Sequence, residues 1–341
     1  MPIFTEDGVT GTADISVLIV AHNSRDTIPA CLASLEAQTV KPREVWVLEN
    51  GSSADRRLDA TNLPDWVRFV DSAENLGFAG GSNHLAAQAS GRWLALLNPD
   101  AFARPDWIEQ LQAATQRYPD IALFGSTQYA AENPDLLDGA GDVYHAVGLA
   151  YRSAYHRPVS ELPPEGEVFG PCGAAAMIRA DVFAELDGFD ERFFCYNEDV
   201  DLAYRARLLG HRTIQLRDAA IDHMGYGSSG RRSAFATYYG ARNRLWVFLR
   251  DTPGWLFWLL APAHAGITLL LWLSAARFGQ FGLFGKAIGD ALKAWPELAR
   301  SRRELQARAK VPPSAIASAM TWNPFALLTR QSDIRPWPRR D

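Results

Sequence analysis

Short apolar runs alternate with helix-like stretches through the first half of the chain, and this alternation limits the fold more than any other feature of the sequence. The runs have the length and bounds of buried strands, and they cover residues 15–20, 44–48, 67–70, 93–97 and 121–125. Helices are predicted for residues 28–38 and from Pro105, because proline is tolerated in the first turn of a helix. Such alternation builds an α/β fold with a mainly parallel sheet flanked by helices, and ligands bind at the carboxyl ends of its strands.

The remainder of the chain changes character. Residues 131–170 are rich in Gly, Pro and polar side chains, which predicts a long irregular insertion over the binding site. A strand at 174–178 and a helix at 198–209 follow, and Gly210 ends that helix. We therefore expect four regions, which are an N-terminal extension (1–14), an α/β domain (15–230), a helical apolar region (231–310) and a basic tail (311–341).

Residues 252–276 contain no charged residue, and their length is within the roughly 17–25 residues that cross a bilayer. Pro253 and Pro262 interrupt the segment, and basic residues flank both of its ends, whereas a single span has more positive charge on one side. We expect a re-entrant or surface-lying helical hairpin. A buried helix of a C-terminal subdomain is the alternative.

Charge disfavours one class of partner and favours another. The net charge of the 341 residues is −5, which argues against nucleic acid as the main partner. Residues 277–341 carry 12 Lys or Arg and 5 Asp or Glu, a balance of +7, and this basic region predicts contact with anionic lipid headgroups. The three cysteines lack metal-ligand spacing and the N-terminus lacks the basic and apolar regions of a signal peptide, so a cytoplasmic protein is expected.

Polar residues follow the first two predicted strands at their carboxyl ends. After the first strand, Ala21 and Asn23, with the backbone amides around them, can lie near a nucleotide, although many α/β proteins begin this way. After the second, the carboxylate of Glu49 can accept hydrogen bonds from a ribose or a pyrimidine base. The alternative for this segment is that Asn50 and Gly51 only form a turn.

A glycine-rich segment follows the third predicted strand. Gly77, Gly80 and Gly81 permit tight backbone close to a ligand, and Asn75 and Asn83 flank them. Backbone amides at the start of the next helix could then face a diphosphate. A glycine-rich connection without a ligand is the alternative.

The fourth predicted strand delivers Asn98 and Asp100 to the mouth of the sheet. Oxygen ligands at this place suit Mg²⁺ or Mn²⁺ bound together with substrate phosphates. The alternative is that Asn98, Pro99 and Asp100 form a turn and cap the next helix.

The last predicted helix of the α/β domain carries two acidic residues in its first turn. Asp199 shares an inward face with Leu202, Ala203 and Ala206, whereas Glu198 points to a neighbouring face. A helix N-terminus favours an ionised carboxylate, and such a carboxylate beside a sugar can remove a proton from an acceptor hydroxyl. A capping carboxylate in a solvated first turn is the alternative.

In combination these segments resemble the motifs of family 2 glycosyltransferases, and most of all those of a bacterial rhamnosyltransferase-like branch. The motifs that carry the resemblance are NLGFAGG (75–81), LLNPD (96–100), GFDE (188–191) and FFCYNEDVDL (193–202), followed by Arg205. The resemblance covers about residues 16–230. It implies a GT-A fold with a mainly parallel, mixed sheet, to which this chain adds a helical, apolar C-terminal extension.

The resemblance also implies roles for particular residues. Asp100 matches the metal-binding carboxylate, and Asn98 stands where many relatives have an aspartate. Asp199 matches the catalytic base, and Glu198 is expected to support the acceptor site. Glu49 stands where most relatives have aspartate.

Two later segments complete the resemblance. His223 matches a histidine that in relatives lies near the metal and the diphosphate, although a lone histidine is more often structural. Arg242 and Asn243 resemble a recurring Arg–Asn pair, whose guanidinium could meet either a diphosphate or an acidic neighbour on a helix.

The implied reaction is metal-dependent, inverting transfer of a sugar from a nucleotide diphosphate, with dTDP-L-rhamnose as the preferred donor, to a hydroxyl of a cell-surface glycan or a lipid-linked acceptor. Mg²⁺ or Mn²⁺ is the expected cofactor. A non-catalytic nucleotide-binding scaffold is disfavoured because Asp100 and Asp199 are both present. A nucleotidyltransferase would need a basic, Gly-rich loop near the N-terminus, and the sequence has none there.

The expected location is the inner face of the plasma membrane, where the C-terminal third would hold the enzyme. The apolar segment is rich in tryptophan, which favours the membrane interface. The alternative is a soluble protein whose Trp-rich helix packs on its own sheet or on a second subunit.

Overall fold

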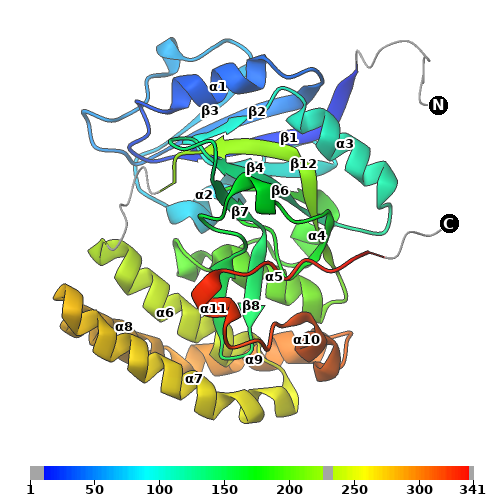
Figure 1. Cartoon of the computed structure of the whole chain (residues 1–341). Coiled ribbons are helices and arrows are strands. Elements are labelled where there is room, and N and C mark those ends of the chain that lie inside the picture. The colour runs from blue at the N-terminus through cyan, green and yellow to red at the C-terminus, as the bar shows by residue number, and fades with distance from the viewer. Residues whose placement is uncertain (1–10, 226–232, 338–341) are drawn as a thin grey trace.

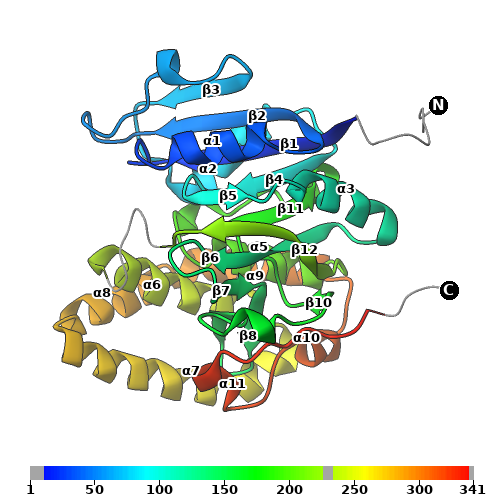
Figure 2. The same ribbon diagram turned by 45° about the horizontal axis from the view of Figure 1, so that its top comes forward.

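The computed structural model describes residues 11–225 and 233–337, and within them ten strands form one sheet. Along the sheet the order is β10-β12-β6-β11-β4-β1-β2-β3, while β5 pairs with β12 and β7 pairs with β6 (Figures 1 and 2). The strands are β1 (Thr12–Ala21), β2 (Lys41–Asn50), β3 (Val67–Ser72), β4 (Trp93–Leu97), β5 (Ala101–Ala103), β6 (Leu123–Ala130), β7 (Leu137–Ala140), β10 (Gly166–Val168), β11 (Ala175–Arg179) and β12 (Thr213–His223). A separate pair contains β8 (Asp142–His145) and β9 (Leu149–Arg152).

The sheet has a parallel half and a mixed half. In the first, β1 runs parallel to β2 and β4, and β2 runs parallel to β3. In the second, β6 and β12 are parallel, whereas β11 runs antiparallel between β4 and β6. The predicted α/β class with a mixed sheet is confirmed. The first four predicted strands, β1 to β4, pair in parallel, as expected.

Helices cover both faces of the sheet, and the sheet itself separates two apolar cores. On one face α1 (Ile28–Glu36) and α3 (Trp107–Arg117) pack with Val17 and Ile19. On the other face α2 (Gly77–Ala86), α4 (Ala180–Glu185) and α5 (Glu198–Leu208) pack with Leu18. These side chains alternate because successive residues of a strand point to opposite faces. Short 3₁₀ turns are η1 (Ala60–Asn62), η2 (Val159–Glu161), η3 (Glu191–Phe193) and η4 (Ala276–Phe278).

The prediction of an irregular insertion at residues 131–170 is wrong. This segment contains β7, β8, β9 and β10, and both β7 and β10 extend the main sheet. Its strands are only three or four residues long. Gly141, with φ of +76°, lies between β7 and β8, and Gly148, with φ of +78°, lies between β8 and β9. Strands this short carry too few residues for an alternating pattern to stand out.

Six further helices lie below the sheet, on the side of the molecule away from β3 (Figures 1 and 2). They are α6 (Ala234–Asp251), α7 (Gly254–Ala275), α8 (Phe281–Lys293), α9 (Trp295–Arg308), α10 (Pro313–Ala319) and α11 (Ala326–Thr329). The expected helical hairpin at 252–276 is wrong, because α7 is one continuous helix with Pro262 in its interior. Pro262 lies on the exposed side, where water can satisfy the carbonyl that loses its partner.

The chain after α9 returns to the α/β domain instead of extending from it as a tail. Arg335 forms a β-bridge with Glu167, and Thr321 forms one with His145. Several basic side chains of the C-terminal region are already paired, among them Arg308 with Asp187, Lys310 with Glu185 and Arg335 with Asp333. The local balance of +7 therefore overstates the charge available to a lipid surface. Residues 1–10, within the predicted N-terminal extension, lie outside the described residues.

Candidate active site

The loops that follow β1 and β2 interlock at the carboxyl edge of the sheet. Asn23 adopts a positive φ of 54°, which asparagine tolerates better than most residues. Its amide donates to Ser52 Oγ at 2.8 Å, and its side-chain oxygen accepts from the Ser53 amide at 3.0 Å. The two loops therefore hold each other in place, and Asn23 is partly exposed there.

The glycine-rich segment joins the same edge through amide side chains. Asn50 donates to Asn75 Oδ1 at 3.1 Å and accepts from the Leu76 amide at 2.9 Å. The carbonyl of Asn50 lies 3.0 Å from His22 Nδ1, and Asn75 Nδ2 lies 3.3 Å from the same ring. Because Asn75 is exposed, it remains accessible to a ligand beside His22.

Glu49 does not face a ligand, which corrects the role expected for it. Its side chain is fully buried, and its two oxygens accept the backbone amides of Ser52 at 2.7 Å and Leu58 at 2.8 Å. Buried carboxylates need such partners, so Glu49 folds the loop after β2. Ala21, the last residue of β1, is also fully buried and offers no exposed side chain.

The three glycines allow close packing between elements. Gly77 has φ of +70°, and a Cβ there would lie 2.3 Å from the carbonyl oxygen of Phe194. Gly80 and Gly81 lie inside α2, where a Cβ on Gly81 would lie 2.7 Å from Val20. The predicted loop near a ligand is thus a helix held against the sheet and against the Phe194 loop.

Asn83 and Arg242 also have structural partners where ligand contacts were predicted. Asn83 donates to the Phe189 carbonyl at 2.9 Å and accepts from the Phe189 amide at 2.8 Å. Arg242 meets neither a diphosphate-facing loop nor an acidic side chain; it donates to the carbonyls of Arg192 and Phe193 at 2.8 and 3.1 Å. Both residues therefore hold the backbone that leads to α5.

The segment immediately before α5 has an unusual backbone. Phe194, Tyr196 and Asn197 have φ between 62° and 70°, a conformation that costs free energy for residues with a side chain. Asn243, which is fully buried, donates to the carbonyls of Phe193, Cys195 and Tyr196 at 2.7–2.9 Å. The recurring Arg–Asn pair is thus the support of this loop, a role that the sequence did not reveal.

Asp100, His223 and Asn98 meet at one corner of the site. Since β5 pairs antiparallel with β12, Ala101 lies opposite His223, and Asp100 Oδ1 is 3.4 Å from His223 Nε2. Asn98 Nδ2 lies 3.5 Å from the same ring nitrogen. Burial alone lowers the pKa of a histidine, but hydrogen bonds with Asp100 and Asp138 outweigh it, and the pKa of His223 is raised.

Asp138, on β7, is a site residue that the sequence did not single out. Its Oδ2 lies 2.7 Å from His223 Nδ1, and Arg152 forms an ion pair with the same carboxylate. Burial raises the pKa of Asp138, but the hydrogen bond from His223 and the charge of Arg152 lower it below its ordinary value. The segment around Asp138 was predicted to be irregular, and no spacing rule links it to His223.

Asp199 lies in the first turn of α5, as predicted, and it is partly exposed. Its oxygens accept the amides of Gly173 at 2.9 Å and Val200 at 2.8 Å. The Gly173 loop is joined to the end of β4, because the Asn98 amide donates to the Ala174 carbonyl at 2.9 Å. Asp199 therefore belongs to the same edge of the sheet as Asn98.

Two carboxyl groups, those of Asp142 and Glu198, lie near Asp199. Burial raises the pKa of Asp199, although its two amide donors oppose this. Burial and the charge of Asp199 raise the pKa of Asp142 to about 8 and that of Glu198 well above its ordinary value. Glu198 is buried, and within the described residues its Oε2 has no hydrogen-bond partner.

Asp142, Cys172 and Asp199 also form the one group of three metal-ligand side chains found in the described residues, with ligand atoms within 4.8 Å of one another. Burial raises the pKa of the Cys172 thiol to about 12 and, together with the charge of Asp199, that of Asp142 to about 8, so a cation bound here would have to displace protons. Asp100 and His223, 3.4 Å apart, are a second pair of candidate metal ligands.

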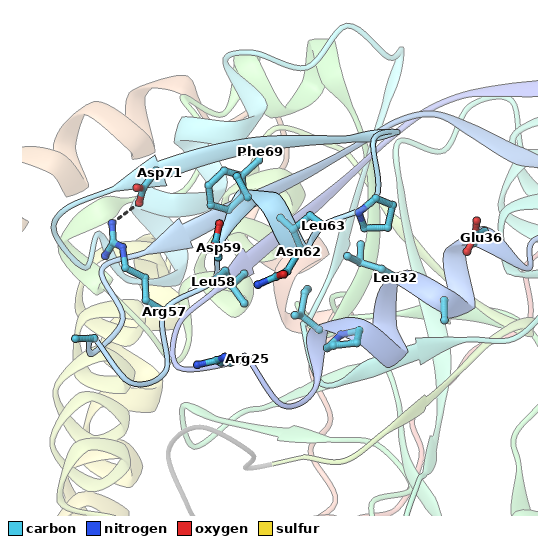
Figure 3. Close-up of a pocket in the computed structure, with 16 residues that line it drawn as sticks. Arg25, Leu32, Glu36, Arg57, Leu58, Asp59, Asn62, Leu63, Phe69 and Asp71 are labelled. Atoms are coloured by element: carbon cyan, nitrogen blue, oxygen red, sulfur yellow. Dashed lines mark hydrogen bonds and ion pairs between the residues drawn. The ribbon is translucent and has the colours of Figure 1, made fainter.

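A pocket of about 780 Å³ lies apart from these residues, between α1, β3 and the loop that joins β2 to β3 (Figure 3). Leu32, Leu58 and Phe69 line it, and the ion pair of Arg57 with Asp71 lies at one side. It contains none of the predicted site residues.

Known proteins resemble this chain in both sequence and fold. The family model of glycosyl transferase family 2 matches residues 16–187. N-acetylglucosaminyl-diphospho-decaprenol L-rhamnosyltransferase of Mycobacterium tuberculosis is 28% identical over 295 residues, which cover 77% of this chain and 94% of that protein.

Two solved structures share the fold at 16% identity. GalNAc-T7 with UDP, GalNAc and Mn²⁺ aligns with a TM-score of 0.54 over 72% of this chain and 49% of that one. The mannosyltransferase PcManGT from Pyrobaculum calidifontis, in complex with GDP-Man and Mn²⁺, aligns with a TM-score of 0.50 over 95% and 91%. With the family model matching half of its residues, this chain belongs to glycosyltransferase family 2 and is a glycosyltransferase that uses a nucleotide-sugar donor.

Proposed function

We propose that the chain is an inverting glycosyltransferase in which Asp199 is the catalytic base. The observation that carries the proposal is the placement of Asp199, whose partly exposed carboxyl lies in the first turn of α5 and accepts the amides of Gly173 and Val200. Burial raises its pKa, and a raised pKa brings a carboxylate base closer to neutral pH.

In this reaction the acceptor hydroxyl gives its proton to Asp199 while its oxygen attacks the anomeric carbon. The bond to the acceptor oxygen forms on the face opposite the nucleotide, and the bond to the diphosphate oxygen breaks. The nucleoside diphosphate leaves with the bonding electron pair. One displacement inverts the anomeric centre.

Asp100 and His223, with Asn98 beside them, would hold a divalent cation. The pair combines a carboxylate and an imidazole nitrogen, which fits the cations proposed, whereas Asn98 turns its side-chain nitrogen toward His223. The nitrogen ligand favours Mn²⁺ over Mg²⁺, because Mg²⁺ prefers oxygen ligands throughout. When bound, the cation supplies positive charge against the departing diphosphate.

For the substrates we favour dTDP-L-rhamnose as donor and a hydroxyl of a lipid-linked or cell-surface glycan as acceptor. The relative from Mycobacterium tuberculosis is named for L-rhamnosyl transfer to a decaprenyl-linked acceptor, and it covers most of this chain. The alternative, a non-catalytic nucleotide-binding scaffold, would not explain why the carboxyl of Asp199 is held at the carboxyl edge of the sheet by two backbone amides.

Helix α7 supports a peripheral position on the inner face of the plasma membrane. Together with η4 it is long and apolar enough to cross a bilayer, with a mean hydropathy of 1.8. However, every fourth residue of one face is buried, namely Leu256, Leu260, His264 and Thr268, and His264 stacks on Phe248 of α6. The helix thus lies along the protein, and its opposite face exposes Trp255, Trp258, Leu259, Leu269, Leu270 and Leu273. This face would rest in the membrane interface.

A donor screen tests the reaction. Purified protein is incubated with Mn²⁺ or Mg²⁺, a panel of nucleotide sugars and a polyprenyl-diphosphate-linked acceptor, and nucleotide release is measured. We expect acceptor-dependent release from one donor, its loss in excess chelator, and its loss in Asp199→Asn. Equal release with and without acceptor, or full activity in chelator, would contradict the proposal.

A further inference from the structure

His223 presents one ring nitrogen to Asp100 and the other to a buried carboxylate. Nε2 lies 3.4 Å from Asp100 Oδ1, and Nδ1 lies 2.7 Å from Asp138 Oδ2. We propose that Asp138 is a positioning residue that fixes the orientation of His223, so that Nε2 is aimed at the divalent cation. This inference rests on the proposed role of Asp100 and His223 as cation ligands.

The strand order explains how Asp138 reaches its position. β7 pairs with β6, β6 pairs with β12, and His223 is the last residue of β12. Asp138 and His223 are 85 residues apart in the chain, and both are buried.

The chemistry of the two side chains selects one arrangement of the ring. With the ring hydrogen on Nδ1 directed at Asp138 Oδ2, 2.7 Å away, a cation would bind the lone pair of Nε2. The ion pair of Arg152 with the same carboxylate holds Asp138 in this position. A carboxylate behind a metal-binding histidine orients the ring and raises its basicity in the same manner.

The chain that leaves His223 passes close to the same carboxylate. Gly225 has φ of +64°, and a Cβ at this position would lie 3.4 Å from Asp138 Oδ1. A side chain at this position would therefore meet the carboxylate that holds the His223 ring.

Mn²⁺ binding, measured by electron paramagnetic resonance in the presence of dTDP, tests the inference. We expect Asp138→Ala to weaken Mn²⁺ binding by about 10–100-fold, the usual effect of losing such a partner. Asp138→Asn should lose less, because its carbonyl oxygen can still accept from Nδ1. The matched control is Asp222→Asn on β12, the strand that carries His223. The carboxylate of Asp222 pairs with Arg104 and not with His223, so the Mn²⁺ affinity of this variant should equal that of the wild type.

A double-mutant cycle separates positioning from general loss of structure. If Asp138 acts through His223, then Asp138→Ala should weaken Mn²⁺ binding no further in a His223→Ala protein. Wild-type Mn²⁺ affinity in folded Asp138→Ala, or additive losses in the cycle, would overturn the inference and leave the proposed reaction intact. If the wild type itself binds no Mn²⁺ with dTDP, the proposed cation site fails, and the inference fails with it.

Discussion

Replacing Asn243 by alanine tests whether the loop before α5 is held from α6. The side-chain nitrogen of Asn243 contacts three carbonyls, but its two hydrogens make about two full hydrogen bonds. At about 0.5–1.5 kcal/mol for each of the two bonds, and with about 1–3 kcal/mol for a carbonyl left unsatisfied, the free energy of unfolding should fall by about 2–6 kcal/mol.

The same substitution should reduce catalysis, because Asp199 follows this loop directly. A displacement of about 1 Å at a catalytic group can cost about 100-fold, so we expect a fall in kcat of that order. The matched control is Gln38→Ala. Gln38 is also buried and makes three hydrogen bonds to backbone atoms, at 2.8–3.0 Å. Its partners are the carbonyls of Ser34 on α1 and Arg104 before α3, and the amide of Ile108 at the start of α3, all outside the loop before α5.

Chemical denaturation and initial rates at saturating donor measure both effects. Gln38→Ala should lose a similar free energy of unfolding and retain its kcat. A wild-type kcat in Asn243→Ala would refute the reasoning, and so would an equal loss of kcat in Gln38→Ala.

Three other predictions concern the base, its neighbour and α7. Asp199→Asn should lower kcat by about 10²–10⁴-fold and retain donor binding by calorimetry, since the shape remains and the base is lost; turnover near that of the wild type would contradict this. Burial holds the pKa of Asp142 at about 8, against an ordinary value of 3.8. Between these pH values the folded protein keeps a proton that the unfolded chain releases. The free energy of unfolding therefore falls as the pH rises from about 4 to about 8. Asp142→Asn cannot ionise, so its melting temperature relative to the wild type should climb from pH 4 to pH 8, and a constant difference would argue against a buried, protonated carboxyl. Replacing Trp258 and Leu270, both exposed, by serine should weaken sedimentation with anionic liposomes and leave the melting temperature unchanged; unaltered binding, or a wild-type dimer that the change dissociates, would show that this face does not meet lipid.

The sequence predicted the parts of the fold that local patterns encode. The apolar runs of β1, β2 and β4 are buried between helices, where a strand is apolar on both faces, whereas β3 is the partly exposed edge strand. β7 to β10 were missed because each has only three or four residues, too few for an alternating pattern to stand out.

The candidate site was predicted where a strand end or a helix start fixes a residue, as for Asp100 and Asp199. Buried polar contacts could not be foreseen, because the partner is chosen by the tertiary structure. Glu49 and Asn83 looked like ligand-binding residues, yet each satisfies backbone groups. Asp138 and Asp142 come from the segment that was read as irregular, and only the pairing of β7 with β6 brings the first of them to His223.

The anomeric configuration of the product tests the central claim most directly. The donor identified by nucleotide release is incubated with acceptor and Mn²⁺, and the new linkage is assigned by nuclear magnetic resonance from the one-bond carbon–hydrogen coupling at the anomeric position. A single displacement assisted by Asp199 predicts a linkage opposite in configuration to the donor, formed by the wild type and lost in Asp199→Asn. A linkage with the configuration of the donor would contradict the account.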